Sequence, residues 1–332
     1  GARSPEPGAR SPAAGGWRLA AGGWRLARKS RLAFPRLRRY HPAMPARLVI
    51  FLAAFLVFPL WLGPSAAATE WSLEPDASRT FVFPDAPPSL WREALGIEKA
   101  TAATVLLPTD YTEDRDFPLL LLIGGAQGNH GHEADWIRQY VGDTGIICVS
   151  IPLFIRELAP MEEDESNRWI RLYLGPEESA WIWRAWRPML ETVFAAIPNI
   201  DRSKCFIGGF SNGANATAIV LDNPETGPEL RDYFGHFVLI EGGKEISARP
   251  AFDGLSFLVC EGALKAGRFQ PIATGLSRIP GVAVNFHQMP GVGHAVPDHE
   301  KRWVGNWIRA KCALPALDPI RPEEGVVTDD FE

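Results

Sequence analysis

Short apolar runs that alternate with helical stretches constrain the fold of this 332-residue chain more than any other feature of its sequence. From residue 117 onward, uninterrupted apolar runs end in glycine or proline, which is typical of strands buried on both faces. Because strand and helix alternate, the sequence predicts an α/β fold with a mainly parallel sheet. The predicted strands are 80–83, 102–107, 119–123, 145–151, 205–207, 236–240, 255–260 and 282–287, and the predicted helices are 133–141, 177–197, 214–222, 272–279 and 300–312.

The carboxyl ends of these predicted strands carry the residues from which a site could be built. A Gly-Gly pair at 124–125 follows one strand, and Ser211 stands at the end of another. Glu241, Glu261 and His294 follow three more strands. Ligands of open α/β sheets bind beyond the carboxyl ends of the strands. The sequence therefore places its candidate chemistry on one rim of the sheet.

The segment 204–215 has the pattern of a strand, a tight turn and a helix, with a serine at the turn. Residues 209–213, Gly-Phe-Ser-Asn-Gly, fit the Gly-x-Ser-x-Gly motif of a nucleophile elbow. Because the turn is tight and its serine strained, the residues two positions away must be almost without side chains. Since the bare motif also occurs by chance, Ser211 is predicted as a nucleophile only together with its surroundings.

A histidine that could activate Ser211 follows it in the chain. His294 stands in the segment 291–297, Gly-Val-Gly-His-Ala-Val-Pro, beyond the last predicted strand. A histidine titrates near neutral pH and can take the serine proton. The order of serine before histidine is that of the Gly-x-Ser-x-Gly hydrolases. The alternative is that His294 is one more surface histidine among the seven of the chain.

The serine motif also requires N–H donors for an oxyanion. One candidate is the backbone N–H of Asn212, directly after the serine. The other is the backbone N–H of Ala126, in the glycine turn that follows the strand 119–123. The alternative for this turn is that it only links a strand to a helix.

His130, His132 and Glu133 suggest a metal site at first sight. A zinc site needs three or four ligands held together, and no matching cluster of His or Cys follows at a telling spacing. The sequence therefore predicts a polar loop near the mouth of the site, without a metal. The chain has four cysteines. Because three of them stand in apolar runs, we expect buried thiols rather than a disulfide framework.

Residues 1–43 differ in composition from the rest of the chain. They contain nine arginines and one lysine against one acidic residue, and they repeat Gly-Gly-Trp-Arg-Leu-Ala at 15–20 and 22–27. One interpretation is a basic arm for nucleic acid or membrane. The interpretation that we favour is a low-complexity segment upstream of the true start at Met44.

Residues 44–68 have the pattern of a secretory signal peptide. Arg47 lies in a short positive region, 48–62 is an uncharged apolar run, and 64–68 ends in small residues with an Ala-x-Ala site. The apolar run is short for a membrane-spanning helix, which needs about 20 residues. We therefore predict a cleaved signal and export to the periplasm or the exterior, with an uncleaved anchor as the alternative.

The charge of the remaining chain excludes one class of partner. Residues 69–332 contain 23 basic and 38 acidic residues, for a net charge of −15. Nucleic-acid binding requires a basic face, so we expect no nucleic-acid partner. We expect one domain at 69–312 and a disordered acidic, proline-rich tail at 313–332.

Several of these motifs together resemble a known family. They are Phe-Pro at 117–118 before the Gly-Gly turn, Ile-Asp-Arg at 200–202, Ile-Gly-Gly-Phe-Ser-Asn-Gly at 207–213 and Met-Pro-Gly-Val-Gly-His at 289–294. Over roughly 105–310, the chain resembles exported α/β-hydrolases of the polyhydroxybutyrate-depolymerase and feruloyl-esterase-like group. The resemblance implies an α/β-hydrolase fold and a serine ester hydrolase without metal or organic cofactor.

The third member of the catalytic triad departs from that family. There, an aspartate commonly follows a glycine like Gly262 by a few residues. Here, the segment 263–265 contains no carboxylate and ends in Lys265. Glu261, at the tip of the same strand, is our candidate for the acid, and Glu241, at the tip of the preceding strand, is the other. An absent acid is the remaining possibility.

The leading hypothesis is an exported serine esterase in which Ser211 attacks the ester and His294 moves the proton. Its substrate would be a small-molecule or polymeric ester. A second hypothesis is a binding protein that keeps the fold but has lost its triad acid, because Lys265 stands at the acid position. A serine peptidase is the third, although the chain has no room for a propeller-sized domain that restricts access.

Overall fold

The computed structural model of the chain describes residues 71–86, 100–125, 134–154, 176–247, 252–265 and 267–321. All of them belong to the compact unit Pro64–Glu332. The predicted N-terminal segment 1–43 and signal peptide 44–68 lie outside the described residues. Within the described part of the chain, no helix has both the length and the apolar character needed to cross a membrane.

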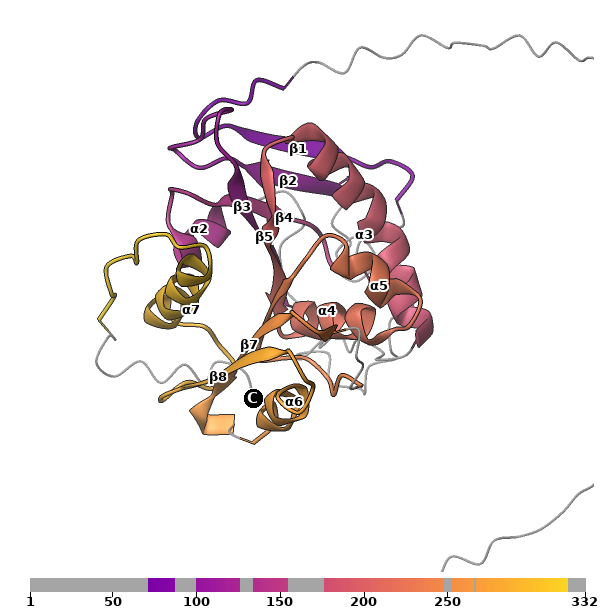
Figure 1. Cartoon of the computed structure of the whole chain (residues 1–332), viewed down its shortest axis with the longest axis vertical. Helices are drawn as coiled ribbons and strands as arrows, with labels where there is room; N and C mark the ends of the chain where they lie inside the picture. Colours follow the sequence, from indigo (N-terminus) through magenta and orange to yellow (C-terminus); the bar gives the residue numbers. More distant parts are fainter. Residues whose placement is uncertain are drawn as a thin grey trace, which may run out of the picture. The chain divides into compact units, whose positions relative to one another are not determined.

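The described residues contain a sheet of eight strands in the order β1-β2-β4-β3-β5-β6-β7-β8. Figure 1 labels most of these strands. β1 and β2 pair antiparallel with each other, and β2 pairs antiparallel with β4. All other neighbours pair parallel, as the sequence predicts. The strands are β1 Ser78–Val82, β2 Ala102–Leu106, β3 Phe117–Ile123, β4 Ile147–Ser150, β5 Ile200–Phe210, β6 His236–Ile240, β7 Ser256–Gly262 and β8 Ala283–Met289.

Burial along the strands follows their position in the sheet. Every residue of β3, β4 and β7 is buried, because neighbouring strands flank them and helices cover both faces. The edge strand β1 instead alternates between exposed and half-buried residues, which is the period of two expected when one face of a strand meets solvent. The uninterrupted apolar runs of the sequence therefore mark the middle of the sheet.

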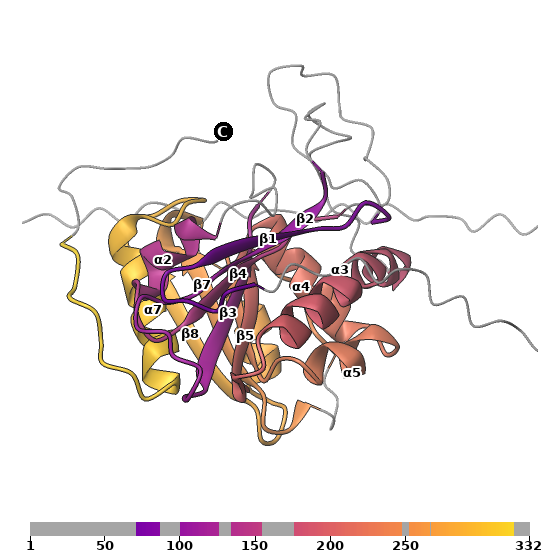
Figure 2. The same cartoon turned by 90° about the horizontal axis from the view of Figure 1, so that it is seen from above.

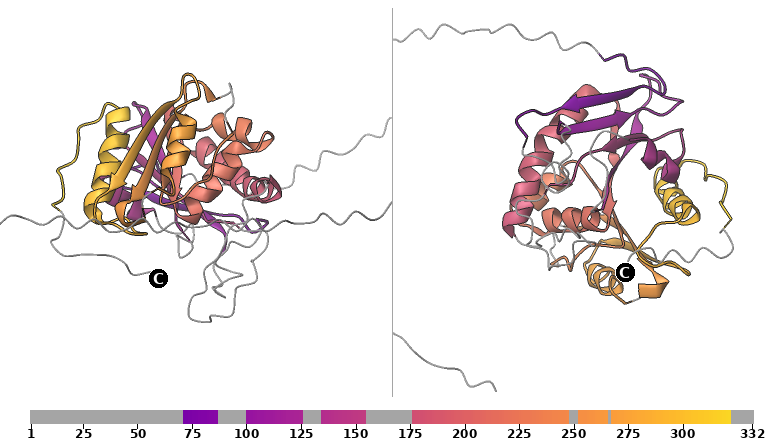
Figure 3. Two further views of the ribbon diagram at one scale, coloured as in Figure 1. Left: turned by 90° about the horizontal axis from the view of Figure 1, so that it is seen from below. Right: turned by 180° about the vertical axis from the view of Figure 1, so that it is seen from behind.

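Helices cover both faces of the sheet, with α2 and α7 on one face and α3, α4, α5 and α6 on the other (Figures 1 and 2). Figure 3 shows α6 and α7 on opposite sides of the strands. Each face has its own apolar core, built from alternate residues of the same strands. The helices are α2 Asp135–Val141, α3 Pro176–Ala196, α4 Asn212–Asp222, α5 Thr226–Arg231, the 3-10 turn η2 Ala263–Lys265, α6 Gln270–Leu276 and α7 Asp298–Lys311.

Of the α-helices in the described ranges, α5 alone is not predicted by the sequence. It has six residues and includes Gly227 and Pro228, which are poor helix formers. Tertiary contacts offset this weakness. The indole N–H of Trp183 on α3 donates to the carboxylate of Glu229 at 2.9 Å, and Leu230 is buried in the core.

The four cysteines are buried and their thiols are free. Cys148, Cys205 and Cys260 lie in β4, β5 and β7, so the prediction of buried cysteines within strands is confirmed. Burial raises the pKa of the Cys148, Cys205 and Cys312 thiols to about 12. These thiols therefore stay protonated at neutral pH and pack as small apolar groups.

The prediction of a disordered tail is wrong for residues 313–321. Leu317 exchanges two hydrogen bonds with the side chain of Asn306 on α7, at 2.7 and 3.1 Å. Leu314 and Leu317 pack against Gly145 and Gly142, where a Cβ atom would lie about 3 Å from a leucine methyl group and the leucine would have to shift. Composition alone suggested disorder, but two leucines three positions apart reach glycines that leave room for them. Residues 322–332 lie outside the described residues.

Candidate active site

Ser211 stands in a strained turn between β5 and α4. Its φ of 53° lies in the left-handed region that non-glycine residues seldom adopt, at a cost of about 1–3 kcal/mol. The backbone N–H of Ser211 donates to the carbonyl of Ile240 at 2.8 Å, which ties the turn to the end of β6. The side chain is half-buried and therefore remains within reach of solvent.

The two glycines of the motif are required by the close approach of β3. A side chain at Gly209 or at Gly213 would collide with the carbonyl of Ile123, at the end of β3. Any larger residue would push the turn away from the sheet and move Ser211. The spacing in Gly-x-Ser-x-Gly therefore has a physical cause in this structure.

His294 lies beside the serine, in the loop between β8 and α7. Its Nε2 is 2.9 Å from Ser211 Oγ. The ring packs against Phe210 with the ring centroids 4.9 Å apart, so the imidazole has an apolar wall on one side. Ser211 and His294, 83 positions apart in the sequence, thus lie within hydrogen-bond distance of each other.

Glu241 contacts the other ring nitrogen of His294. Its Oε2 is 3.1 Å from His294 Nδ1, and its other oxygen accepts the backbone N–H of Gly262. Only 1 % of Glu241 is exposed, and its φ of 50° is again in the left-handed region. We call Ser211, His294 and Glu241, joined by these hydrogen bonds, the Ser–His–Glu chain.

The strand order and the serine elbow define the architecture. A mainly parallel eight-stranded sheet carries a strained serine between strand and helix, followed in sequence by a histidine that bonds to it. The fold is the α/β-hydrolase fold. This confirms the fold that the resemblance implies.

Comparison with known proteins gives no close relative by sequence. No protein-family model matches the chain, and no curated protein matches it. Similar solved structures include an esterase from the fungus Rhizomucor miehei, at 15% identity and a TM-score of 0.47 over 73% of this chain and 85% of that one. A carboxylesterase from Mesorhizobium loti matches at 17% identity and a TM-score of 0.45, over 69% and 98% of the two chains. A thermostable esterase matches at 16% identity and a TM-score of 0.44 over 71% of this chain. The chain spans 60% of that protein's length.

Glu261, the first candidate for the acid of this α/β-hydrolase fold, lies elsewhere. It is fully buried, and its Oε1 accepts the backbone N–H groups of Arg268 and Phe269 at 2.5 and 3.0 Å. Along β7 its side chain shares a face with Phe257 and Val259, the face that α6 covers. Glu261 therefore holds the entry to α6, and the position beside His294 belongs to Glu241.

One sequence signal could have favoured Glu241. The pair Gly242–Gly243 follows it, and a side chain at Gly242 would collide with the carbonyl of Ser211. Glycine at that position is therefore required by contact with the turn that carries Ser211. Lys265 ends the turn η2, and the lack of a carboxylate there does not leave His294 without an acidic partner.

Of the two residues predicted to bind an oxyanion, the structure describes Asn212 but not Ala126. Asn212 is buried and is the first residue of α4, directly after Ser211. Ala126 lies outside the described residues. The adjacent Gly125 is described, and a side chain there would contact both the Phe210 ring and Ser211 Cβ. The turn after β3 therefore begins next to the serine.

Metal ligands do not gather in the described part of the chain, where no group of three or more His, Cys, Asp or Glu could hold an ion. The polar loop with His130, His132 and Glu133, which first suggested a metal, lies outside the described residues.

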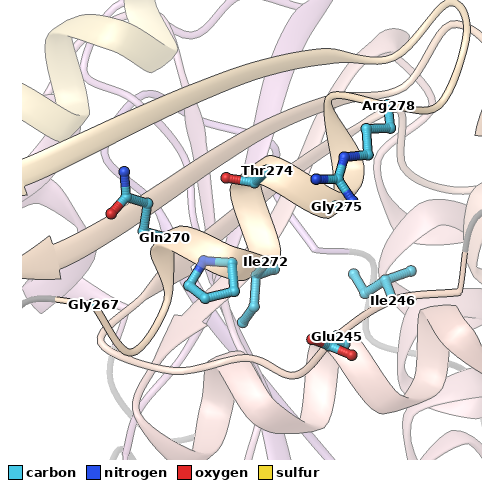
Figure 4. Close-up of a pocket in the computed structure, with 9 residues that line it drawn as sticks. Glu245, Ile246, Gly267, Gln270, Ile272, Thr274, Gly275 and Arg278 are labelled. Carbon is cyan, nitrogen blue, oxygen red and sulfur yellow. The ribbon is translucent and has the colours of Figure 1, made fainter.

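A groove of about 510 Å³ lies between α6 and the segment that follows β6. Figure 4 shows Glu245 and Ile246 on one side of it and Gln270, Thr274 and Arg278 on the α6 side. None of its lining residues belongs to the Ser–His–Glu chain. The groove is thus separate from the candidate chemistry.

Proposed function

We propose that the protein is an exported serine hydrolase that cleaves carboxylic esters through an acyl-enzyme. The observation that carries this proposal is the Ser–His–Glu chain, with its spacings of 2.9 and 3.1 Å. A serine hydroxyl is a poor nucleophile until a base takes its proton. An acid on the far side of the imidazole selects the tautomer that can accept that proton and stabilises the imidazolium. The chain supplies all three groups in contact.

The reaction then has two halves. Ser211 Oγ attacks the ester carbonyl while its proton passes to His294 Nε2, and His294 returns that proton to the departing alcohol. The result is an acyl group on Ser211 and a free alcohol. Water then gives its proton to His294 and attacks the acyl group. Collapse releases the carboxylic acid and returns the proton to Ser211.

The tetrahedral intermediates need N–H donors. Our candidates are the backbone N–H groups of Asn212 and Ala126. The start of α4 at Asn212 supports the first, because a helix N-terminus favours a developing negative charge. The approach of Gly125 to Ser211 supports a donor from the turn after β3.

Our choice of ester over amide rests on the resemblance to exported esterases, because the Ser–His–Glu chain by itself serves either leaving group. A panel of p-nitrophenyl esters and peptide anilides separates the two classes. We expect turnover of the esters, and faster turnover of the anilides would favour a peptidase instead.

The nucleophile is tested with a fluorophosphonate probe, which labels activated serines. We expect the wild-type protein to be labelled and Ser211→Ala to be unlabelled, with His294→Ala labelled at least about 10³-fold more slowly. Equal labelling of wild type and Ser211→Ala would contradict the assignment. A folded wild-type protein that is neither labelled nor active on any ester would support the non-catalytic alternative.

The proposal of export rests on the signal pattern at 44–68 alone. Expression of a chain that begins at Met44 in a bacterial host provides the test. We expect the protein outside the cytoplasm with Thr69 as its first residue. Retention in the cytoplasm with an intact N-terminus would disprove it, and an exported but uncut chain would indicate an anchor.

A further inference from the structure

The backbone that carries Glu241 has an unusual course. Glu241 has a φ of 50° and Gly243 a φ of 114°. A glutamate in the left-handed region persists only where its surroundings hold it there. Because the direction of its carboxylate depends on this backbone, whatever holds the segment 241–243 also sets the contact with His294.

The backbone N–H of Glu241 donates to the carbonyl of Cys260 at 3.0 Å, and two further contacts of this segment lead to the nucleophile turn. Gly242 lies so close to the carbonyl of Ser211 that a side chain would collide with it. The backbone N–H of Gly243 donates to Asn215 Oδ1 at 2.7 Å. The backbone N–H of Asn215 in turn donates to the carbonyl of Ser211 at 3.0 Å. Asn215 therefore bonds to the nucleophile turn on one side and to the segment that carries the acid on the other.

The bond to Gly243 is the shorter of the two hydrogen bonds that the Asn215 side chain makes to described residues. Asparagine is a poor helix former, because its amide competes for backbone groups, yet Asn215 lies inside α4 among alanines and other small residues. Its Nδ2 is only 3.4 Å from Asn212 Oδ1, which is a long hydrogen bond. The shorter bond to Gly243 is the contact that an alanine could not make.

We propose that Asn215 is a positioning residue that holds the segment 241–243 so that Glu241 bonds to His294. The inference rests on the proposed function and adds a residue to it. Asn215 does not touch the reacting atoms and acts through Glu241. Without Oδ1, the N–H of Gly243 loses its partner, and Glu241 can relax toward a negative φ that carries its carboxylate away from His294.

The test compares Asn215→Leu, which has similar size but no acceptor, with Asn215→Asp, which keeps an acceptor oxygen. The substrate is p-nitrophenyl acetate, and active sites are titrated with the fluorophosphonate so that unfolded protein does not count. We expect Asn215→Leu to lower kcat per titrated site about tenfold to hundredfold, with KM within about twofold, because a misplaced group slows chemistry more than binding. Asn215→Asp should stay within about threefold of the wild type.

A second measurement separates positioning from a general loss of stability. Asn215→Leu is combined with Glu241→Ala, and the effects on kcat are compared in a double-mutant cycle. If Asn215 acts through Glu241, its replacement has almost no further effect once the carboxylate is gone. The inference would be overturned if Asn215→Leu lowered kcat by the same factor with and without Glu241→Ala, or if it left kcat unchanged. Should Asn215→Leu fail to fold, Asn215→Ala takes its place in the cycle.

Failure of this inference differs from failure of the proposed function. Loss of labelling in Ser211→Ala, a large effect of Glu241→Ala and no effect of Asn215→Leu would reject the positioning role alone. Full labelling of Ser211→Ala would reject the nucleophile, and the positioning role with it.

Discussion

Two buried glutamates end neighbouring strands, and their hydrogen bonds separate their roles. Glu241 bonds to His294 with one oxygen and accepts the N–H of Gly262 with the other. Glu261 accepts two backbone N–H groups with one oxygen, and within the described residues its second oxygen has no hydrogen-bond partner. An unpaired buried oxygen weakens the fold by about 1–3 kcal/mol. The two N–H groups that Glu261 accepts lie at the entry to α6, so this glutamate holds the start of that helix and does not contact His294.

These bonds predict opposite outcomes for two conservative changes. In Glu241→Gln, the N–H of Gly262 keeps the amide oxygen on its side, so the NH₂ group faces His294 Nδ1. That donor forces the proton onto Nε2, which can then no longer accept the proton of Ser211. We expect kcat per titrated site to fall by about three to four orders of magnitude, as in other triads with the wrong tautomer.

Glu261→Gln is the matched control for that change. We expect it to keep kcat per titrated site within about threefold of the wild type. The amide has one acceptor oxygen for Arg268 N–H and Phe269 N–H, so those bonds can remain. A larger loss of kcat in Glu261→Gln than in Glu241→Gln would reverse the two assignments.

Among the elements, β8 and α7 together position the loop that carries His294. His287 on β8 bonds to Glu300 on α7, with Nε2 2.6 Å from Oε2. The ring of His287 also stacks on Trp303, with centroids 3.6 Å apart and an angle of 8° between the planes. The two ends of the loop are therefore joined directly. Glu300 is buried, with 5 % of its side chain exposed, against 17 % for His287.

Removing this pair should loosen the junction. We expect Glu300→Ala to lower the free energy of unfolding by about 2–3 kcal/mol, less than for a fully buried pair, because His287 keeps some contact with water. Urea denaturation measures the change. Trp303→Phe, which keeps an aromatic ring stacked on His287, should lower the free energy of unfolding by about 1 kcal/mol or less. Equal effects of the two changes would show that the hydrogen bond contributes little.

At the scale of the whole molecule, His236 makes stability depend on pH. It lies at the start of β6, half-buried and stacked on Phe206 with centroids 4.4 Å apart. Burial lowers its pKa below the ordinary value of 6.5, the nearby charge of Lys311 acts in the same direction, and a hydrogen bond to the Ser203 carbonyl partly opposes them. The folded protein thus binds this proton less readily than the unfolded chain.

The sign of the effect follows from this difference in proton binding. As the pH falls below about 6.5, the unfolded chain takes up the proton first, so the folded state loses stability. We expect the urea midpoint of the wild type to drop between about pH 7 and about pH 5.5. The midpoint of His236→Gln should drop less over the same range. Asp110, Asp201 and Asp298 have lowered pKa values, so their contribution is lost only near and below their ordinary 3.8. An equal drop in His236→Gln would exclude His236 as the source.

Secondary structure and the position of Ser211 in a strand–helix turn could be predicted from the sequence because both depend on local patterns. The strand β6 has the predicted bounds, and the other predicted strands and helices are present with shifts at their ends. Helix α4 begins at Asn212 rather than at residue 214, because the elbow passes directly into the helix. Helix α5 and the packed segment 313–321 depend on partners far away in the chain, which no local pattern reveals.

By itself, the sequence determined the α/β architecture, the serine at its elbow and the histidine that follows it. Apolar runs buried on both faces and glycines spaced around a serine leave few other solutions. Only the tertiary structure decided which glutamate meets His294. That choice depends on the left-handed backbone of Glu241, on the N–H of Gly262 from the next strand and on the contact of Gly242 with Ser211. These interactions join residues that lie 21 or more positions apart, so no stretch of sequence contains them.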